Sequence, residues 1–179
     1  GLYYNKMMNK LESSEAEKNK WRSRISKEIE LAVKVQENFI PKRNLENYPV
    51  KGINIPAREV SGDFFSFYPN NENIYFIIAD VAGKGIHAGM VMAKASTLFE
   101  VLSQGKVDLD EMVFHMNNDL FNTKTGGMFV TGIIGNYDII SEEIKWVNAG
   151  HQPALIRHTK GNFEEFESKS PPLGVIFQK

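Results

Sequence analysis

The positions of the apolar residues indicate that the chain begins with one long helix. Between residues 6 and 38 there is no proline or glycine, and the composition is rich in Glu, Lys, Ala and Leu. Apolar side chains recur at close to the 3.6-residue period of an α-helix at Trp21, Ile25, Ala32, Val35 and Phe39, and Ile29 and Leu31 widen this stripe. The pattern predicts an amphipathic helix that ends at Pro41, because a proline disfavours the helical conformation in the residue before it.

Two interpretations of this helix remain open. Its apolar stripe could dock on the domain that follows. Alternatively, the stripe could form a coiled coil that pairs two chains and carries a signal from an upstream domain.

From residue 50 onward the period of the apolar residues changes to two, which is typical of strands. Residues 50–55 are predicted to form one strand. Residues 63–69 and 74–80 are aromatic and β-branched runs on either side of an Asn-rich stretch, the pattern of a β-hairpin. Apolar side chains occur on both faces of this hairpin, so we expect both faces to be covered, as in a sandwich.

The rest of the chain predicts two consecutive helices and then more short strands. The helices are expected at residues 87–102 and 108–121, with Asp108 as the N-cap of the second. The strands are expected at residues 128–134, 144–148, 154–158 and 163–166. Short antiparallel strands interrupted by a pair of helices indicate an α+β sandwich and not a doubly wound parallel sheet.

The predicted hairpin register brings two aspartates together. If residues 70–73 form a four-residue loop, Pro69 lies opposite Ile74, and Asp63 then lies opposite Asp80. Directly opposed residues of an antiparallel pair have Cβ atoms roughly 4.5–5.5 Å apart, where like charges are destabilising. A cation between the carboxylates removes that repulsion, so the hairpin predicts a metal site with oxygen ligands. A register slip of one residue, or two unrelated strand-end caps, are the alternatives.

Composition narrows the class of protein. The 179 residues are 42% hydrophobic and 24% charged, which is typical of a soluble globular domain. The net charge of −1 gives no support for binding to nucleic acid or to a membrane surface. The chain has no cysteine, which excludes disulfides, thiolate zinc sites and cysteine nucleophiles and fits a cytoplasmic location. It starts at Gly1 without a methionine and stops at Lys179 without a closing helix, so we expect a fragment of a longer protein.

Residues 79–89 superficially resemble a phosphate-binding loop between a strand and a helix. However, Gly83, Gly85 and Gly89 give the spacing G-x-G-x-x-x-G, which fits neither phosphate-loop template. Nucleotide binding is therefore the weaker alternative, and the glycines would instead let the backbone pass close to a metal. His87 and His151 are the histidines nearest these motifs. We expect both to be structural, and no Ser-His-Asp pattern stands out.

Six segments of the chain carry recognisable motifs in a fixed order. They are Gln36-Glu-Asn-Phe-Ile-Pro41, Glu59-Val-Ser-Gly-Asp63, Asp80-Val-Ala-Gly-Lys-Gly85 with Ala88-Gly-Met-Val-Met-Ala93, Met128-Phe-Val-Thr131, Asn148-Ala-Gly-His151-Gln-Pro153 and Pro171-Pro-Leu-Gly174. Together they resemble the SpoIIE/RsbU branch of the metal-dependent protein phosphatase 2C family. The resemblance extends from about residue 30 to the C-terminus.

The resemblance implies an αββα sandwich of two antiparallel sheets flanked by helices, with residues 1–40 as a linker helix and residues 41–179 as the phosphatase domain. Asp63 and Asp80 would be the catalytic carboxylates. Asp63 would bridge two Mn²⁺ or Mg²⁺ ions, and Asp80 would bind one of them with the Val81 carbonyl nearby. A metal-activated water would then hydrolyse phosphoserine or phosphothreonine.

The resemblance also implies partners and a location. Substrates of this branch are typically phosphorylated anti-anti-sigma (STAS-type) proteins, and the linker helix often forms a homodimer and switches activity. The protein would be cytoplasmic, and an upstream sensor domain could tether it to a membrane. No nucleic-acid partner is expected.

One departure from the family pattern leaves a second function open. The family completes its metal shell with a later Asp-Gly motif and a further aspartate, both of which would lie beyond Lys179. We therefore expect residues 41–179 to be a domain that lacks its C-terminal part. The alternative is a non-catalytic pseudophosphatase that binds a partner without hydrolysing it.

Overall fold

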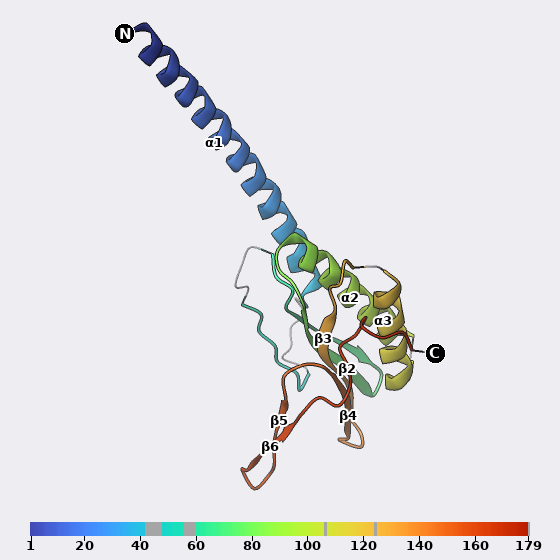
Figure 1. Ribbon diagram of the computed structural model, residues 1–179. Helices are drawn as coiled ribbons and strands as arrows, with labels where there is room; N and C mark the ends of the chain where they lie inside the picture. Colours follow the sequence, from blue (N-terminus) through green and yellow to red (C-terminus); the bar gives the residue numbers. More distant parts are fainter. Residues whose placement is uncertain (42–47, 56–59, 106, 124, 179) are drawn as a thin grey trace.

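The computed structural model has a long helix attached to a small α+β domain (Figure 1). It describes residues 1–41, 48–55, 60–105, 107–123 and 125–178. The helices are α1 (Leu2–Gln36), the short 3-10 helix η1 (Glu37–Phe39), α2 (Ile86–Gln104) and α3 (Leu109–Asn122). The strands are β1 (Phe64–Asn70), β2 (Asn73–Val81), β3 (Val130–Asp138), β4 (Ile144–Ala149), β5 (Ala154–Arg157) and β6 (Phe163–Phe166).

Helix α1 confirms the predicted long helix and projects away from the domain (Figure 1). None of its residues is buried, and Trp21 of the apolar stripe is 57% exposed. Docking along the whole length of the stripe is therefore wrong. In the described part of the chain only its C-terminal end contacts the domain: Phe39 packs against the core, the last turns of α1 contact α2, and Gln36 bonds to Ser61. No helix in the described part of the chain is long and apolar enough to cross a membrane.

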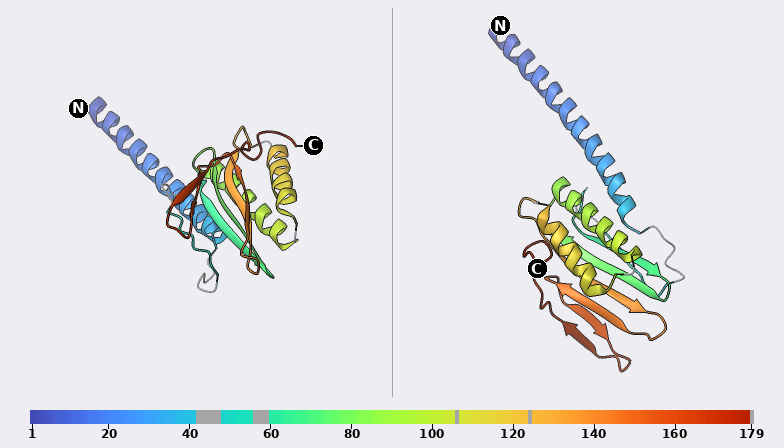
Figure 2. Two further views of the ribbon diagram at one scale, coloured as in Figure 1. Left: turned by 90° about the horizontal axis from the view of Figure 1, so that it is seen from below. Right: turned by 90° about the vertical axis from the view of Figure 1, so that its right-hand side faces the viewer.

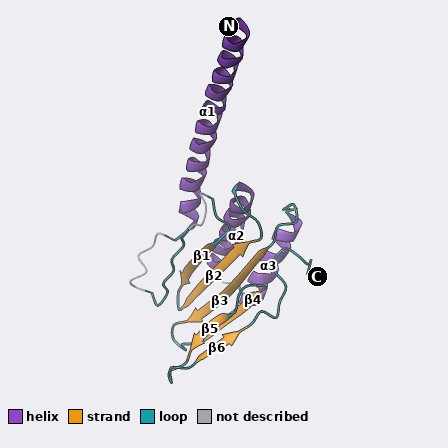
Figure 3. Ribbon diagram, turned by 60° about the vertical axis from the view of Figure 1, so that its left-hand side comes forward, coloured by secondary structure: helices purple, strands orange, loops and turns teal. Residues whose placement is uncertain are grey.

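Four antiparallel strands in the order β1-β2-β3-β4 form the main sheet (Figure 3). In the β1–β2 hairpin Pro69 pairs with Ile74, which confirms the predicted register. The turn is shorter than predicted, because Asn70 also pairs with Asn73. Asn71 accommodates the tight turn at φ 53°, a left-handed conformation that asparagine tolerates better than most residues.

Helices α2 and α3 lie together over one face of the main sheet (Figure 2). The core lies between these helices and that face, and it includes Phe64, Ile77, Ala79, Met92, Ala95, Phe99, Met112, Met116, Leu120, Val130 and Ile134. Both helices agree with the sequence prediction to within two residues. Asp108 is the N-cap of α3 as predicted, although its side chain makes no capping hydrogen bond.

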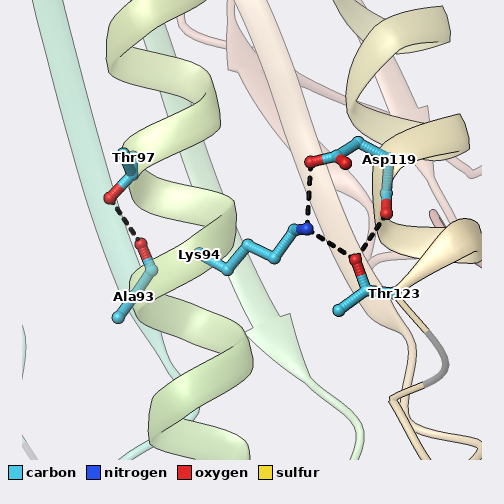
Figure 4. A network of polar contacts seen from close by, with 5 residues as sticks. All are labelled: Ala93, Lys94, Thr97, Asp119 and Thr123. Atoms are coloured by element: carbon cyan, nitrogen blue, oxygen red, sulfur yellow. Dashed lines mark hydrogen bonds and ion pairs between the residues drawn. The ribbon is translucent and has the colours of Figure 1, made fainter.

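A polar network joins α2 to α3 on the outer side of this layer (Figure 4). Lys94 Nζ lies 3.1 Å from Asp119 Oδ2 and donates a 2.5 Å hydrogen bond to Thr123 Oγ1. The Thr123 hydroxyl in turn donates to the Asp119 carbonyl. Because the charged side chains are partly exposed, this ion pair contributes at most about 1 kcal/mol.

The opposite face of the main sheet is less completely covered. The β5–β6 hairpin forms a second antiparallel sheet beside β4, where Trp146 packs edge-on against Phe166 at 5.3 Å between ring centroids. Phe67 is buried on this face, but Ile78 remains 50% exposed. Two antiparallel sheets with helices are thus confirmed, while the described residues cover this second face only in part.

The strand predicted at residues 50–55 is absent. This segment has no regular secondary structure, and Ile53 and Ile55 are exposed. Gly52 lies against the ring of Phe65, where a side chain would collide with the ring. The alternating pattern was not sufficient, because a strand also needs a ladder partner and residues 50–55 pair with none of the described strands.

Candidate metal centre

The polar residues of the site meet at one end of the main sheet. Because neighbouring strands are antiparallel, β1 and β3 begin at the end of the sheet where β2 and β4 finish (Figure 3). Asp63 immediately precedes β1, and Asp80 lies near the end of β2. Thr131 lies at the start of β3 opposite Asp80, and His151 follows β4. Four separate segments therefore contribute side chains to one place.

Asp63 and Asp80 are adjacent, as the sequence predicted. The last pair in the register of the hairpin is Phe64 with Ala79, so Asp63 is the next position, opposite Asp80. The pKa of the Asp80 carboxyl is raised by burial and then by the charge of Asp63 and a side-chain hydrogen bond with it. A register slip and unrelated strand-end caps are both wrong, because each would separate these carboxylates.

The loop before β1 fixes the orientation of Asp63. The Asp63 backbone N–H donates to Ser61 Oγ at 3.1 Å, and that hydroxyl lies 3.4 Å from Asp63 Oδ2. Asn54 donates a 3.2 Å hydrogen bond to the Asp63 carbonyl. These contacts hold the exposed carboxylate of Asp63 at the surface of the domain, beside Asp80.

Gly62 allows the carbonyl of Val81 to approach the carboxylates. A Cβ atom at Gly62 would lie 3.0 Å from the Val81 carbonyl oxygen and 3.3 Å from Asp80 Oδ1. Both oxygens therefore lie close to the same point in space. Any larger residue at position 62 would separate this loop from the end of β2.

Gln36, the last residue of α1, holds the same loop from the other side. Its Nε2 donates a 2.5 Å hydrogen bond to the Ser61 carbonyl, and its Oε1 accepts a 3.0 Å hydrogen bond from the Ser61 backbone N–H. We call this pair of bonds the Gln36–Ser61 clamp. Gly89 of α2 completes the junction, because a Cβ there would collide with Val60 and lie 3.2 Å from Gln36 Nε2.

His151 also belongs to the site, although the sequence led us to expect a structural role. Its backbone N–H donates to Asn148 Oδ1 at 2.9 Å, and its Nδ1 lies 2.9 Å from Thr131 Oγ1. Burial lowers the pKa of His151, and the charges of Asp80 and Asp63 act in the opposite direction. His87, by contrast, is exposed on the first turn of α2.

A hollow of about 220 Å³ opens beside Asp63. It is lined by Ile53, Asn54, Asp63, Phe64, Phe65, Ile78, Ala79 and His151. Its lining combines five apolar residues with the polar residues Asn54, Asp63 and His151.

The donor set fits a hard divalent cation as an open site. Two carboxylates and one backbone carbonyl are oxygen ligands of the kind that Mg²⁺ and Mn²⁺ prefer, and water commonly completes such shells. Within the described ranges, no three His, Cys, Asp or Glu side chains lie close enough together to hold one ion. Glu59, which belongs to the first motif of the resemblance, lies outside the described residues.

Comparison with known proteins identifies the family. Residues 70–178 match the family model for stage II sporulation protein E (SpoIIE), which is more than half of the chain. The chain belongs to the SpoIIE family. This places it in the SpoIIE/RsbU-type branch of the metal-dependent protein phosphatase 2C group, as the six segments implied.

A curated relative is consistent with the SpoIIE assignment. The chain is 29% identical over 154 residues to phosphoserine phosphatase RsbU of Bacillus subtilis, covering 84% of this chain and 46% of RsbU. It therefore spans about half the length of that relative.

The solved structures show the fold. The SiaA-PP2C domain of Pseudomonas aeruginosa superimposes with a TM-score of 0.70 at 14% identity, covering 86% of this chain and 64% of that one. RsbX, whose structure is in complex with magnesium, gives a TM-score of 0.58 at 18% identity, covering 71% of this chain and 61% of RsbX.

Proposed function

We propose that this chain is the catalytic part of a metal-dependent protein phosphatase that acts on phosphoserine or phosphothreonine. The observation that carries the proposal is the opposed pair Asp63 and Asp80, held together although burial and mutual repulsion disfavour the charged form of Asp80. A structural role would not require that arrangement, whereas a bound cation would compensate for it. The similarity to a phosphoserine phosphatase supports the same reaction class.

Asp63, Asp80 and the carbonyl of Val81 would hold Mn²⁺ or Mg²⁺. Such ions supply Lewis acidity, which lowers the pKa of a bound water and neutralises the phosphoryl oxygens. The residues themselves hold the carboxylate oxygens in place: the Ser61 hydroxyl orients Asp63, and Gly62 leaves room for the Val81 carbonyl.

The reaction would be hydrolysis by direct attack of water. The water oxygen bonds to phosphorus while the bond between phosphorus and the seryl oxygen breaks, and the seryl oxygen leaves with a proton as the free hydroxyl. The hollow beside Asp63 is open to solvent, which suits a phosphorylated side chain presented on the surface of another protein. A phosphorylated STAS-type anti-anti-sigma protein in the cytoplasm is the substrate we propose.

Pairing of two chains through α1 is part of the proposal. An isolated helix gains little from its own apolar stripe in water. Helix α1 nevertheless has 35 residues, none of them buried, with Trp21, Ile25 and Val35 each at least half exposed. Light scattering of the protein should give the mass of a dimer, and a monomer at high concentration would contradict this part.

The test is Mn²⁺-dependent phosphate release from a phosphoserine STAS-type protein. Wild type is compared with Asp63→Asn and with Glu72→Gln, which removes a carboxylate at the exposed hairpin turn. We expect release that requires Mn²⁺, is lost in Asp63→Asn and is unchanged in Glu72→Gln. Binding of the phosphoprotein without release would instead identify a pseudophosphatase. Thermal protection by ATP would favour the nucleotide-binding alternative.

A further inference from the structure

One side chain from a distant part of the chain holds the backbone of Ser61. The Ser61 N–H donates to Gln36 Oε1 at 3.0 Å, and Gln36 Nε2 donates to the Ser61 carbonyl at 2.5 Å. These partners fix the orientation of the Gln36 amide, because a backbone N–H only donates and a backbone carbonyl only accepts. Ser61 is 8% exposed, and its backbone has no other hydrogen bond within the described ranges. Water would therefore replace the Gln36–Ser61 clamp poorly.

The core determines where Gln36 lies. Phe39, three residues after Gln36, packs against the core, and its carbonyl accepts a 3.3 Å hydrogen bond from Ser96 Oγ of α2. A Cβ at Gly89 of α2 would collide with Val60 and lie 3.2 Å from Gln36 Nε2, so glycine leaves the room that both residues need. The clamp thus ties the loop of Ser61 to a position that packing elsewhere has fixed.

Ser61 passes this constraint on to Asp63. The Asp63 N–H donates to Ser61 Oγ at 3.1 Å, and the same hydroxyl lies 3.4 Å from Asp63 Oδ2, which can only accept. Gly62, between them, packs against the Val81 carbonyl. Residues 61–63 are therefore held by Gln36 at one end and by the end of β2 at the other. Without Gln36, the hydroxyl that orients Asp63 would lose its support.

We propose that Gln36 is a positioning residue that sets the affinity of the Asp63–Asp80 pair for a divalent cation. This inference rests on the proposed function, in which that pair binds Mn²⁺ or Mg²⁺. Gln36 contacts neither carboxylate and acts through Ser61. Removing a residue that holds a metal ligand from outside the ligand shell typically lowers metal affinity by about 10–100-fold.

Two variants break the clamp, and a third is the matched control. Gln36→Met removes both hydrogen bonds but keeps an unbranched side chain with good helix propensity. Gln36→Glu keeps an acceptor for the Ser61 N–H and places a carboxylate oxygen against the Ser61 carbonyl. Tyr75→Phe also removes a hydrogen bond of a buried residue, the 3.3 Å bond to the Val107 carbonyl, at the other end of β2 from Asp80.

The first measurement is Mn²⁺ binding by calorimetry. The Kd should rise by about 10–100-fold in Gln36→Met and in Gln36→Glu, and it should be unchanged in Tyr75→Phe. An unchanged Kd in Gln36→Met would overturn the inference. An equal rise in Tyr75→Phe would also overturn it, because the effect would then follow from lost stability and not from positioning.

The second measurement is phosphate release as a function of Mn²⁺ concentration. Gln36→Met keeps both carboxylates, so excess Mn²⁺ should restore its kcat by mass action, with KM for the phosphoprotein unchanged. Asp63→Asn should stay inactive at every Mn²⁺ concentration. A loss of kcat in Gln36→Met that excess Mn²⁺ does not restore would contradict a role in metal affinity.

The third measurement needs neither metal nor turnover. In metal-free protein the Asp63 amide should exchange with deuterium about tenfold faster in Gln36→Met than in wild type or Tyr75→Phe. Equal exchange in all three proteins would show that Gln36 does not hold Asp63.

These results separate the inference from the proposed function. If wild type binds Mn²⁺ but releases no phosphate, the proposed function fails, and the Kd values still decide the role of Gln36. If wild type releases phosphate and Gln36→Met binds Mn²⁺ normally, the inference alone fails. Absence of Mn²⁺ binding in wild type would overturn both.

Discussion

Helices α1 and α2 are the two longest helices of the molecule, and different forces hold them. Helix α2 has 19 residues, of which eight are buried, and its fully buried Phe99 and Met92 belong to the core. Helix α1 is almost twice as long and buries none. The stability of α2 thus depends on tertiary packing. The stability of α1 depends instead on helix propensity, on ion pairs such as Arg24–Glu28 and on the contacts that its apolar stripe makes.

Helices α1 and α2 meet beside the loop that carries Ser61 and Asp63. The Gln36–Ser61 clamp joins the last residue of α1 to the loop that orients Asp63, and Gly89 of α2 packs beside it. An exposed helix and a partly buried one therefore contact the loop before Asp63 at the same place. The exposed helix contributes little to the core, but its end contributes hydrogen bonds to the site.

The largest loss of stability should come from a cavity in the core beneath α2. Phe99→Ala removes a fully buried ring and should cost about 3–5 kcal/mol of the free energy of unfolding, measured by urea denaturation. Trp21→Ala on α1, as the matched aromatic control, should change it by less than about 0.5 kcal/mol. Comparable losses from the two variants would contradict the division between the helices.

Breaking the Gln36–Ser61 clamp should have an intermediate effect. Gln36→Ala leaves the backbone N–H and carbonyl of buried Ser61 without these partners, at a cost of about 1–3 kcal/mol. The amide of Ser61 should also exchange faster with deuterium. Gln104→Ala at the exposed end of α2 is the control, and unchanged exchange at Ser61 would argue against the clamp.

Asp80→Asn should stabilise the metal-free protein slightly at neutral pH. Because the pKa of Asp80 is raised in the folded state, folding favours its protonated form, and wild type loses stability as the pH rises through that pKa. The gain in the variant should be at most about 1 kcal/mol, since solvent screens the pair, and should disappear in acid. Thermal melts in chelator at several pH values measure it. A marked fall in the melting temperature at pH 7 would count against carboxylate repulsion.

Removing residues 1–24 should have the smallest effect on unfolding. These residues bury nothing, so the melting temperature of the remaining chain should stay within about 1 °C of wild type. The same protein should lose the dimer in light scattering, which separates assembly from folding. A large drop in melting temperature at low protein concentration would show that α1 supports the domain directly.

Local patterns in the sequence were sufficient for the hairpin and for its aspartates. The register depends on residues close together in the chain, so counting back from Pro69 and Ile74 correctly placed Asp63 beside Asp80. The turn length was wrong because Asn71 can adopt a left-handed conformation that pattern alone does not reveal.

The rest of the site depends on contacts between distant segments. Gln36 and Ser61 are 25 residues apart, and Thr131 and His151 are 20 apart, so no periodicity relates them. For His151 the available signal was its place in the Asn148-Ala-Gly-His151 segment of the resemblance. That segment marked the position without indicating that His151 would contact Thr131.

The tight hairpin turn offers a practical route to measuring distances in this molecule. Glu72 is exposed at the far end of β1 from Asp63, and seven strand residues separate that end from the end that carries Asp63, or roughly 24 Å at 3.4 Å per residue. Since the chain has no cysteine, a thiol introduced at position 72 would be unique. A spin label or fluorophore attached there would report on a paramagnetic ion at the aspartates through space, with its chemistry well away from the residues under study.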